Sequence, residues 1–409
     1  MSEPRVINFG CRLNAAEAAS IEAMLAQAGD ADTVVINSCA VTREAERDAF
    51  AAIRRVKRER PDARIVVTGC AAQIDPKRFE ALIEVAAVVG NRDKLDPAVW
   101  ATRASGVSDI MVRQDFVESD ASLAPGRTRA FVEMQQGCDH RCTFCVIPFG
   151  RGPSRSLPLE RLVARVAQAV DAGRLEVVLT GVDLTAWGSD LSGRPRLGQA
   201  CAEILDRVPG LARLRLSSVD PAELDDTIFE LLAHAPRFAP FLHLSAQAGD
   251  DLILKRMKRR HSRAQILEVA ARARAARPDI AIGADLIAGF PTESEAAFAN
   301  SLALVEEAGF SNAHVFAYSP RPDTPAVRMR AVAPGIVAAR AKKLRQTVAA
   351  ARTRYLAARI GTMAEVLVEK SGRDGLDAQG VRVKLSAPAL RGTLQRVRIL
   401  GHDGTAAFA

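Results

Sequence analysis

Three cysteines crowd into the segment GCDHRCTFC, directly after the strand-like run AFVEMQQ. They are Cys138, Cys142 and Cys145, and three thiolates so close together can hold one face of a small iron–sulfur cluster. No fourth cysteine lies nearby, so one iron would stay open to chelate a small molecule. The alternative is a zinc ion, but His140 lies between the first two thiols, where it could not easily share a tetrahedron with all three. The spacing therefore favours a cluster.

A second set of cysteines is dispersed through the first hundred residues. The apolar runs PRVINFGC, TVVINSC and ARIVVTGC end at Cys11, Cys39 and Cys70, which are separated by 28 and 31 residues. Each separation matches one strand, one helix and two loops, and the carboxyl ends of parallel strands meet along one edge of a sheet. One cysteine at a strand end is ordinarily a packed core residue, and we expect this of Cys201 in LGQACAEIL. Three cysteines at the same position in successive strand–helix units predict a second cluster with one open iron.

The first hundred residues alternate these strand-like runs with helix-like runs at residues 17–29, 43–60 and 76–90. Such alternation predicts an open parallel α/β domain, which we assign to residues 1–115. The segment from Ala101 to Arg127 has weaker periodicity and contains ESDASLAPGRT, so we expect a linker there.

After the linker, strand-like segments recur at wider spacing and each is followed by a helical pattern. The six segments are AFVEMQQ, EVVLTGVD, RLRLSSVD, FLHLSAQ, IAIGADLIAGF and NAHVFAYSP. They predict a parallel α/β barrel or partial barrel over residues 127–355, with functional groups at the carboxyl ends of its strands. A helix from about Gly335 to Arg359 follows, and short alternating strands then predict a small β module at residues 358–409, plausibly barrel-like.

The charge of the chain is placed unevenly. From Ala326 to Ala409 the sequence carries 16 Lys or Arg against 5 Asp or Glu, so this part holds +11 while the rest sums to −3. A basic C-terminal part suggests a surface that binds a polyanion. The alternative is that these charges only lie on solvent-exposed helix faces. The start lacks a signal-like segment, and no apolar run approaches the roughly 20 residues that span a bilayer, so we expect a cytoplasmic protein without a membrane partner. Thiols stay reduced there, which favours metal binding over disulfides.

The compact triad, with Phe144 as the aromatic residue before its last cysteine, resembles the radical S-adenosylmethionine (SAM) superfamily. Together with the dispersed cysteines, the chain looks like a methylthiotransferase of that superfamily. The stretches that carry this resemblance are FGCRLNAAEA, INSCAVT, VTGCAAQ, QQGCDHRCTFCVIPFGRGPSRS, LTGVDLTAWG, LSSVDP, HLSAQAGDDLILKRMKRRH, DLIAGFPTE and HVFAYSPRPDTPA. The resemblance implies a partial (β/α)6 barrel, two 4Fe–4S clusters held by the two cysteine triads, SAM, and a C-terminal TRAM module that grips RNA.

The barrel and the resemblance together predict that SAM is held by residues that close the later strands. The candidates are Phe144, Thr180, Gly181, Asp183, Ser217, Ser218, Gln247, Asp285 and Gly289. Each polar residue after a strand has an alternative role as a helix N-cap. The turn SAQAG, which contains Gln247, departs from the Ser-Leu-Gln-Ser-like turn usual in the family.

The resemblance also implies the reaction. One SAM would methylate sulfur associated with the Cys11/Cys39/Cys70 cluster, and a second would give a radical that removes hydrogen from adenine C2 in a tRNA anticodon loop. A low-potential electron donor such as flavodoxin or ferredoxin and a sulfur donor are implied. The stretches RGPSRS and HVFAYSPRPDTPA favour the branch that acts on threonylcarbamoyl adenosine over those that act on isopentenyladenosine or on a ribosomal-protein aspartate. Two rival hypotheses are a radical SAM enzyme whose second cluster only relays electrons and a zinc-stabilised RNA-binding protein.

Overall fold

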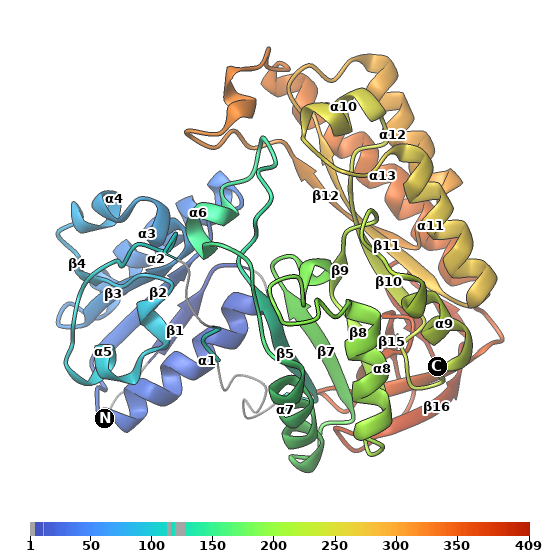
Figure 1. The fold of residues 1–409 in the computed structure, drawn as a ribbon, viewed down its shortest axis with the longest axis horizontal. Helices are drawn as coiled ribbons and strands as arrows, with labels where there is room; N and C mark the ends of the chain where they lie inside the picture. Colours follow the sequence, from blue (N-terminus) through green and yellow to red (C-terminus); the bar gives the residue numbers. More distant parts are fainter. Residues whose placement is uncertain (1–4, 11, 113–115, 119–126) are drawn as a thin grey trace.

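The computed structural model describes residues 5–10, 12–112, 116–118 and 127–409. Cys11 and much of the second half of the expected linker lie outside this set. Figure 1 shows an N-terminal α/β body, a central curved sheet with helices on its outer side, and a C-terminal β module beneath the central sheet. None of the described helices is both long and apolar enough to cross a bilayer.

The N-terminal body is built on the predicted parallel sheet. Its strands are paired in the order β1 (Arg5–Asn8), β2 (Thr33–Ser38), β3 (Arg64–Gly69) and β4 (Val85–Val88). Helices α1 (Arg12–Gln27) and α2 (Arg43–Glu59) form the crossovers between the first three strands. Every residue of β2 is buried, as expected of a strand covered on both faces.

The helix expected over residues 76–90 is wrong in its second half. Helix α4 (Pro76–Glu80) stops after five residues, and Val85–Val88 instead forms β4 at the edge of the sheet. Valines favour strands, and this run finds backbone partners on β3, through Ile65↔Val85 and Val67↔Val88. Tertiary pairing therefore overrides the helical pattern.

The central domain is an open half-barrel. Its parallel strands are β5 (Arg129–Gln136), β7 (Glu176–Gly181), β8 (Arg213–Leu216), β9 (Ser218–Val219), β10 (Phe241–Gln247), β11 (Ala281–Ala288) and β12 (Asn312–Ala317). Only Ser217 separates β8 from β9, and there the half-barrel passes from the sheet β6-β5-β7-β8 to the sheet β9-β10-β11-β12. A short strand, β6 (Arg155–Ser156), pairs antiparallel with β5.

Helices cover the convex face of the half-barrel. They are α7 (Leu159–Asp171), α8 (Leu197–Arg207), α9 (Asp226–His234), α11 (Arg263–Ala276), α12 (Glu295–Glu307) and α13 (Pro334–Ala358), with the short α10 (Asp251–Arg256) near the top. Strand alternation divides the two faces: in β10, Leu242, Leu244 and Ala246 are buried in the helix-covered core. His243, Ser245 and Gln247 therefore belong to the concave face.

The C-terminal module is a six-stranded sheet in the order β16 (Leu394–Arg398), β13 (Met363–Val368), β14 (Asp374–Asp377), β15 (Arg382–Lys384), β18 (Ala407–Phe408) and β17 (Gly401–His402). Ion pairs join it to the amino ends of the barrel strands. Arg213, the first residue of β8, contacts Glu365 at 2.7 Å, and Arg129, the first residue of β5, contacts Glu369 at 2.8 Å. The module therefore lies at the end of the barrel opposite to the compact cysteine triad.

Candidate active site

The compact triad lies in the loop between β5 and α6 (Ile147–Arg151), at the carboxyl end of the first barrel strand. Gly137 begins the loop with φ +70°, and a Cβ there would come within 1.9 Å of the Pro153 carbonyl oxygen. Glycine therefore lets the chain turn out of the sheet. Directly after it, the Cys138 amide donates to the Gly152 carbonyl at 3.0 Å, which closes the base of the loop.

The far side of the barrel holds the same loop in place. The Thr143 hydroxyl donates to the Arg256 carbonyl at 2.7 Å, and the Thr143 amide donates to the Met257 carbonyl at 3.1 Å. The Ala326 amide donates to the Thr143 carbonyl at 2.9 Å. These bonds clamp the cysteine loop from elements more than a hundred residues away in sequence. The Phe144 ring adds an edge contact at 6.3 Å between ring centroids to the buried Phe290.

The three thiols are free and sit among charged groups. The Cys138 thiol donates to Asp183 Oδ2 at 3.6 Å, and Arg259 Nη1 donates to Cys142 Sγ at 3.6 Å. Burial raises the pKa of the Cys145 thiol to about 12, and burial with the nearby Asp183 carboxylate raises the pKa of Cys138 further. Buried thiols of this kind lose their protons when a metal binds, because the metal supplies the positive charge that stabilises the thiolate.

The separation of the sulfurs bears on which metal group fits. In tetrahedral zinc with Zn–S bonds of about 2.3 Å, neighbouring sulfurs lie about 3.8 Å apart. Within the described parts of the chain, two groups of side chains have all their ligand atoms within 4.8 Å of one another, and neither contains a cysteine. His140 is also engaged elsewhere, since its Nε2 lies 2.9 Å from Asp183 Oδ2. Within the described residues, the three thiols are therefore not gathered as closely as the ligands of a zinc ion.

Two cysteines of the dispersed triad lie side by side at the edge of the N-terminal sheet. Cys39 directly follows β2, and Cys70 directly follows β3 as the first residue of α3 (Cys70–Ile74). The residues before them are paired, Ser38 with Gly69, and both thiols are buried. The structure thus brings Cys39 and Cys70 together, whereas Cys11 lies outside the described residues.

A side chain of α6, the helix that follows the compact-triad loop, contacts Cys70. Arg151, the last residue of α6, donates from Nε to Cys70 Sγ at 3.3 Å and from Nη2 to Asn14 Oδ1 at 2.6 Å. It also forms a buried ion pair with Glu17, whose Oε2 lies 2.6 Å from Lys94 Nζ. Burial opposes the charge of Glu17, but these two cations hold its pKa below the ordinary value.

The backbone of α6 packs on the same thiol. A Cβ at Gly150 would lie 3.1 Å from Cys70 Cβ, so the helix approaches the dispersed triad closely at this point. Asn91 Nδ2 donates to the Gly150 carbonyl at 2.6 Å and to Cys70 Sγ at 3.4 Å. The two cysteine groups therefore face each other across α6. Sequence reasoning missed Asn91 and Arg151 as neighbours of Cys70, although Arg151 lies within the quoted stretch GRGPSRS.

Several SAM candidates line the carboxyl ends of the barrel strands near the compact triad. Thr180 and Gly181 end β7, and the Asp183 amide donates to Gln135 Oε1 at 2.8 Å. The Ser217 hydroxyl is buried and has no hydrogen-bond partner within the described ranges, and Ser218 begins β9. These residues come from neighbouring strands and share one end of the half-barrel.

The remaining candidates differ in their surroundings. Gln247 ends β10 with φ +65°, and Gly289 follows β11 with φ +77°. The Gly289 amide donates to Glu293 Oε2 at 2.9 Å. Asp285 lies within β11 rather than at its end, and two histidines contact its carboxylate.

Comparison with protein families finds two matches. A model of the Radical SAM superfamily matches residues 132–305, and a model described as Uncharacterized protein family UPF0004 matches residues 4–90. A protein of Rickettsia prowazekii named Threonylcarbamoyladenosine tRNA methylthiotransferase MtaB is 46% identical over 368 residues, covering 90% of this chain and 87% of the relative. A protein of Cereibacter sphaeroides named tRNA-2-methylthio-N(6)-dimethylallyladenosine synthase is 35% identical over 430 residues, covering 98% of this chain and 97% of the relative.

Solved structures share the fold at low sequence identity. The radical S-adenosylmethionine methyltransferase TsrM from Kitasatospora setae, solved with cobalamin and a [4Fe-4S] cluster bound, superposes with a TM-score of 0.55 at 13% identity, covering 78% of this chain and 77% of that one. The cobalamin-dependent S-adenosylmethionine radical enzyme OxsB superposes with a TM-score of 0.51 at 11% identity, covering 80% of this chain and 55% of that one. The half-barrel is thus a radical SAM fold.

Proposed function

The chain belongs to the methylthiotransferase family of the radical SAM superfamily, and from this membership we propose that it adds a methylthio group to C2 of N6-threonylcarbamoyladenosine beside the tRNA anticodon. The observation that carries the substrate is the sequence identity to the Rickettsia relative, which spans most of both chains. This chain is 35% identical to the dimethylallyladenosine synthase of Cereibacter sphaeroides, compared with 46% for the Rickettsia relative. Isopentenylated adenosine is therefore the second candidate.

The compact triad would hold the radical-generating 4Fe–4S cluster. Cys138, Cys142 and Cys145 are free and held in one loop by hydrogen bonds. When bound, the cluster and SAM supply a 5′-deoxyadenosyl radical, which can take hydrogen from a C–H bond that is neither acidic nor electrophilic. Arg259 donates a hydrogen bond to Cys142 Sγ, which a cluster-bound thiolate can still accept, so it would fix the loop around the cluster.

Phe144 of this loop, together with residues at the ends of the later strands, would hold SAM. The set that we propose is Phe144, Thr180, Gly181, Asp183, Ser217, Ser218, Gln247 and Gly289. The unpaired buried hydroxyl of Ser217 supports the proposal, because buried polar groups usually find a partner. We leave Asp285 out of the set, because histidines of the two neighbouring strands already contact its carboxylate.

The dispersed triad would hold a second 4Fe–4S cluster that carries the sulfur to be transferred. Cys39 and Cys70 adjoin each other at the sheet edge, and we assign Cys11 as the third ligand. Arg151 and Asn91 donate hydrogen bonds to Cys70 Sγ and would stabilise its thiolate. Since α6 links the two triads directly, sulfur and radical would meet at one substrate position.

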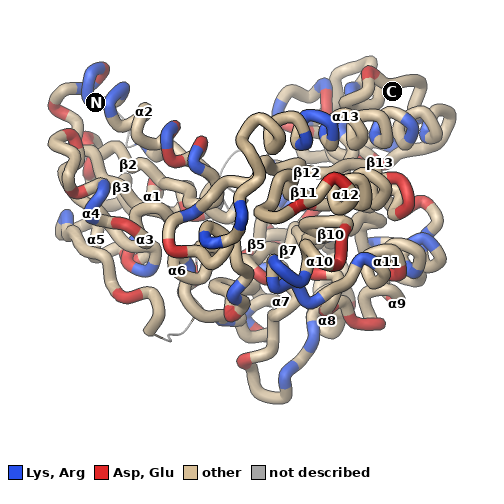
Figure 2. Tube along the Cα trace, turned by 90° about the horizontal axis from the view of Figure 1, so that it is seen from above, with Lys and Arg blue, Asp and Glu red and all other residues tan. Residues whose placement is uncertain are grey.

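RNA would bind through the basic C-terminal part. We propose that residues 358–409 form a TRAM module, that residues 1–115 and 127–355 form the other two domains, and that the basic tail contacts tRNA phosphates. Figure 2 shows Lys and Arg spaced along α13, and Lys342, Lys343 and Arg345 are exposed there. An adenosine in an anticodon loop is single-stranded and can be splayed into a pocket. The proposal places the reaction in the cytoplasm, with flavodoxin or ferredoxin as electron donor and a separate sulfur donor.

Mass spectrometry of tRNA nucleosides tests the substrate. A strain without this gene should lose the methylthio form of threonylcarbamoyladenosine and accumulate the precursor, and the gene with Cys142→Ala should not restore it. Loss of the methylthio form of isopentenyladenosine instead would identify isopentenyladenosine as the substrate. Unchanged nucleosides of both kinds would rule out a tRNA substrate and point to the ribosomal protein.

A further inference from the structure

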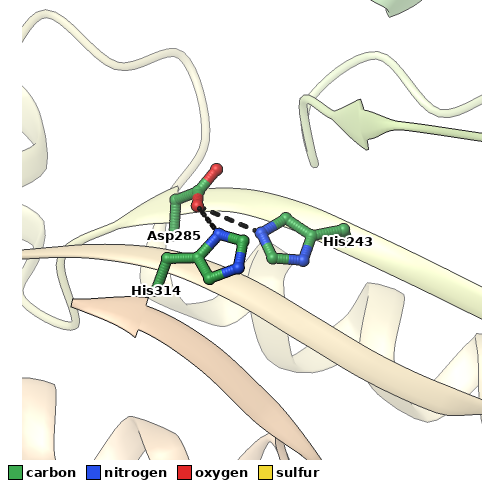
Figure 3. Close-up of side chains that lie close together, drawn as sticks. All are labelled: His243, Asp285 and His314. Atoms are coloured by element: carbon green, nitrogen blue, oxygen red, sulfur yellow. Dashed lines mark hydrogen bonds and ion pairs between the residues drawn. The ribbon is translucent and has the colours of Figure 1, made fainter. Parts of the chain in front are cut away.

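Three side chains with metal-binding atoms meet on the concave face of the half-barrel. They are His243 of β10, Asp285 of β11 and His314 of β12 (Figure 3). The sheet register explains the meeting: Asp285 is paired with His314, and His243 is paired with Gly283, two residues before Asp285. Because side chains two residues apart point to the same face, all three belong to the face away from the helices.

The two imidazoles converge on one carboxylate oxygen. His314 Nδ1 lies 3.0 Å and His243 Nε2 lies 3.1 Å from Asp285 Oδ1, and the ring centroids are 4.9 Å apart. Figure 3 shows both rings turned toward that oxygen. In a tetrahedral site with bonds of about 2.0–2.1 Å, ligand atoms lie about 3.3 Å apart. The two nitrogen–oxygen distances to Asp285 Oδ1 are close to this value.

His243 places a buried imidazole at this group. The residue is 7% exposed, and its Nε2 contacts the Asp285 carboxylate. The ring is also tightly placed, because a Cβ at Gly283 would lie 2.6 Å from His243 Nδ1. The close fit holds the imidazole in place beside the carboxylate, as a ligand position requires.

The charge of the group also suits a cation. The Asp285 side chain is a carboxylate, which is ordinarily ionised at neutral pH, and both imidazoles contact it. Two imidazole nitrogens and one carboxylate oxygen form a common ligand set for zinc and for other divalent transition metals.

We propose that His243, Asp285 and His314 bind a divalent transition metal ion, for which zinc is the best match. Three protein ligands leave at least one coordination position open, as in catalytic zinc sites. The His314 side chain is 58% exposed, so an oxygen or nitrogen donor could reach that position from solvent. The site contains no cysteine and is separate from both triads.

A zinc count on the full chain tests the proposal. The protein is purified anaerobically, both cysteine triads are loaded with iron and sulfide, loosely bound metal is removed, and zinc chloride is titrated against a chromophoric chelator. We expect one tightly bound zinc ion per chain, and His314→Ala and Asp285→Asn should each weaken it at least tenfold. His234→Ala is the matched control, because His234 is exposed at the end of α9 and is not one of the three side chains of the site.

Cobalt gives a second readout that excludes thiolate binding. Co²⁺ bound to this site should show ligand-field absorption without a thiolate charge-transfer band, and the spectrum should vanish in His314→Ala. Since His314 is exposed on the outermost strand of the sheet, this variant is expected to fold. Zinc binding equal in the native protein and in His314→Ala, or a cobalt spectrum with thiolate bands, would overturn the proposal and leave a hydrogen-bonded trio. Both readouts are independent of methylthio transfer.

Discussion

Arg151 donates a hydrogen bond from Nε to Sγ of Cys70 at 3.3 Å, so the helix that follows the compact-triad loop contacts a cysteine of the dispersed triad. The same guanidinium pairs with the buried carboxylate of Glu17 in α1. One side chain thereby joins the N-terminal sheet to the radical SAM half-barrel. This contact has a measurable energetic consequence.

Replacing Arg151 by Met should lower the free energy of unfolding by about 3–5 kcal/mol, because it leaves part of a buried ion pair uncompensated. Urea denaturation of the iron-free protein, followed by circular dichroism, measures the change. Arg141→Met is the control, since Arg141 lies exposed in the compact-triad loop just before α6. Equal stability of the Arg151 and Arg141 variants would show that the network does not hold the domains together.

Glu133 of β5 should make stability fall as pH rises. Burial, together with the charge of Glu17, raises its pKa to about 7 from the ordinary 4.5, and its Oε1 has no hydrogen-bond partner in the described ranges. Between these two pH values the native protein binds more protons than the unfolded chain, so each step up in pH costs stability. The charged groups that act on Glu133 are Glu17, Arg151 and Lys94.

Glu133→Gln removes this titration. The variant should be more stable than the native protein by up to about 3 kcal/mol above pH 7, and the difference should shrink toward pH 4.5. Thermal or urea unfolding across this range provides the comparison, with the exposed Glu268→Gln as control. A difference that is constant with pH would contradict the assigned titration.

Iron content distinguishes one cluster from two. The reconstituted native protein should hold about eight irons per chain, and Cys70→Ala should hold about four. Cys201→Ala, which changes a buried cysteine of the barrel core, should keep about eight. Four irons in the native protein and in Cys70→Ala alike would remove the second cluster from the account.

The C-terminal module should contribute to tRNA affinity through charge. Arg391, Arg396 and Arg398 are exposed on and beside β16. Replacing each by Ala should weaken tRNA binding and reduce the slope of log K against log[salt] by about 1 for each phosphate that is no longer neutralised. Filter binding at several salt concentrations measures the slope, and Arg207→Ala on α8 serves as a control. An unchanged slope in the triple variant would place the RNA elsewhere.

The sequence predicted those parts of the site that follow from local periodicity. Cys39 and Cys70 meet because each ends a parallel strand, and this phase is visible in the apolar runs. The fourth strand, β4, was missed because its identity depends on backbone pairing with β3, a partner that the local pattern does not reveal. Arg151 and Glu17 are 134 residues apart, and no spacing rule connects them.

The histidine–aspartate group shows the same limit. Asp285 was selected because it lies near a strand end, but its neighbours depend on the register between three strands. Alternation alone could have placed His243 and Asp285 on the concave face, since Leu242, Leu244 and Leu286 occupy the core. Their meeting with His314 required the three-dimensional pairing.

The central claim is the substrate, and one reconstituted reaction tests it most directly. The cluster-loaded protein, SAM, a low-potential reductant and a sulfide source are incubated with tRNA that carries threonylcarbamoyladenosine or isopentenyladenosine, and the nucleosides are resolved by mass spectrometry. We predict methylthiolation of threonylcarbamoyladenosine only. Cleavage of SAM to 5′-deoxyadenosine with methylthiolation of isopentenyladenosine, or of neither nucleoside, would contradict it.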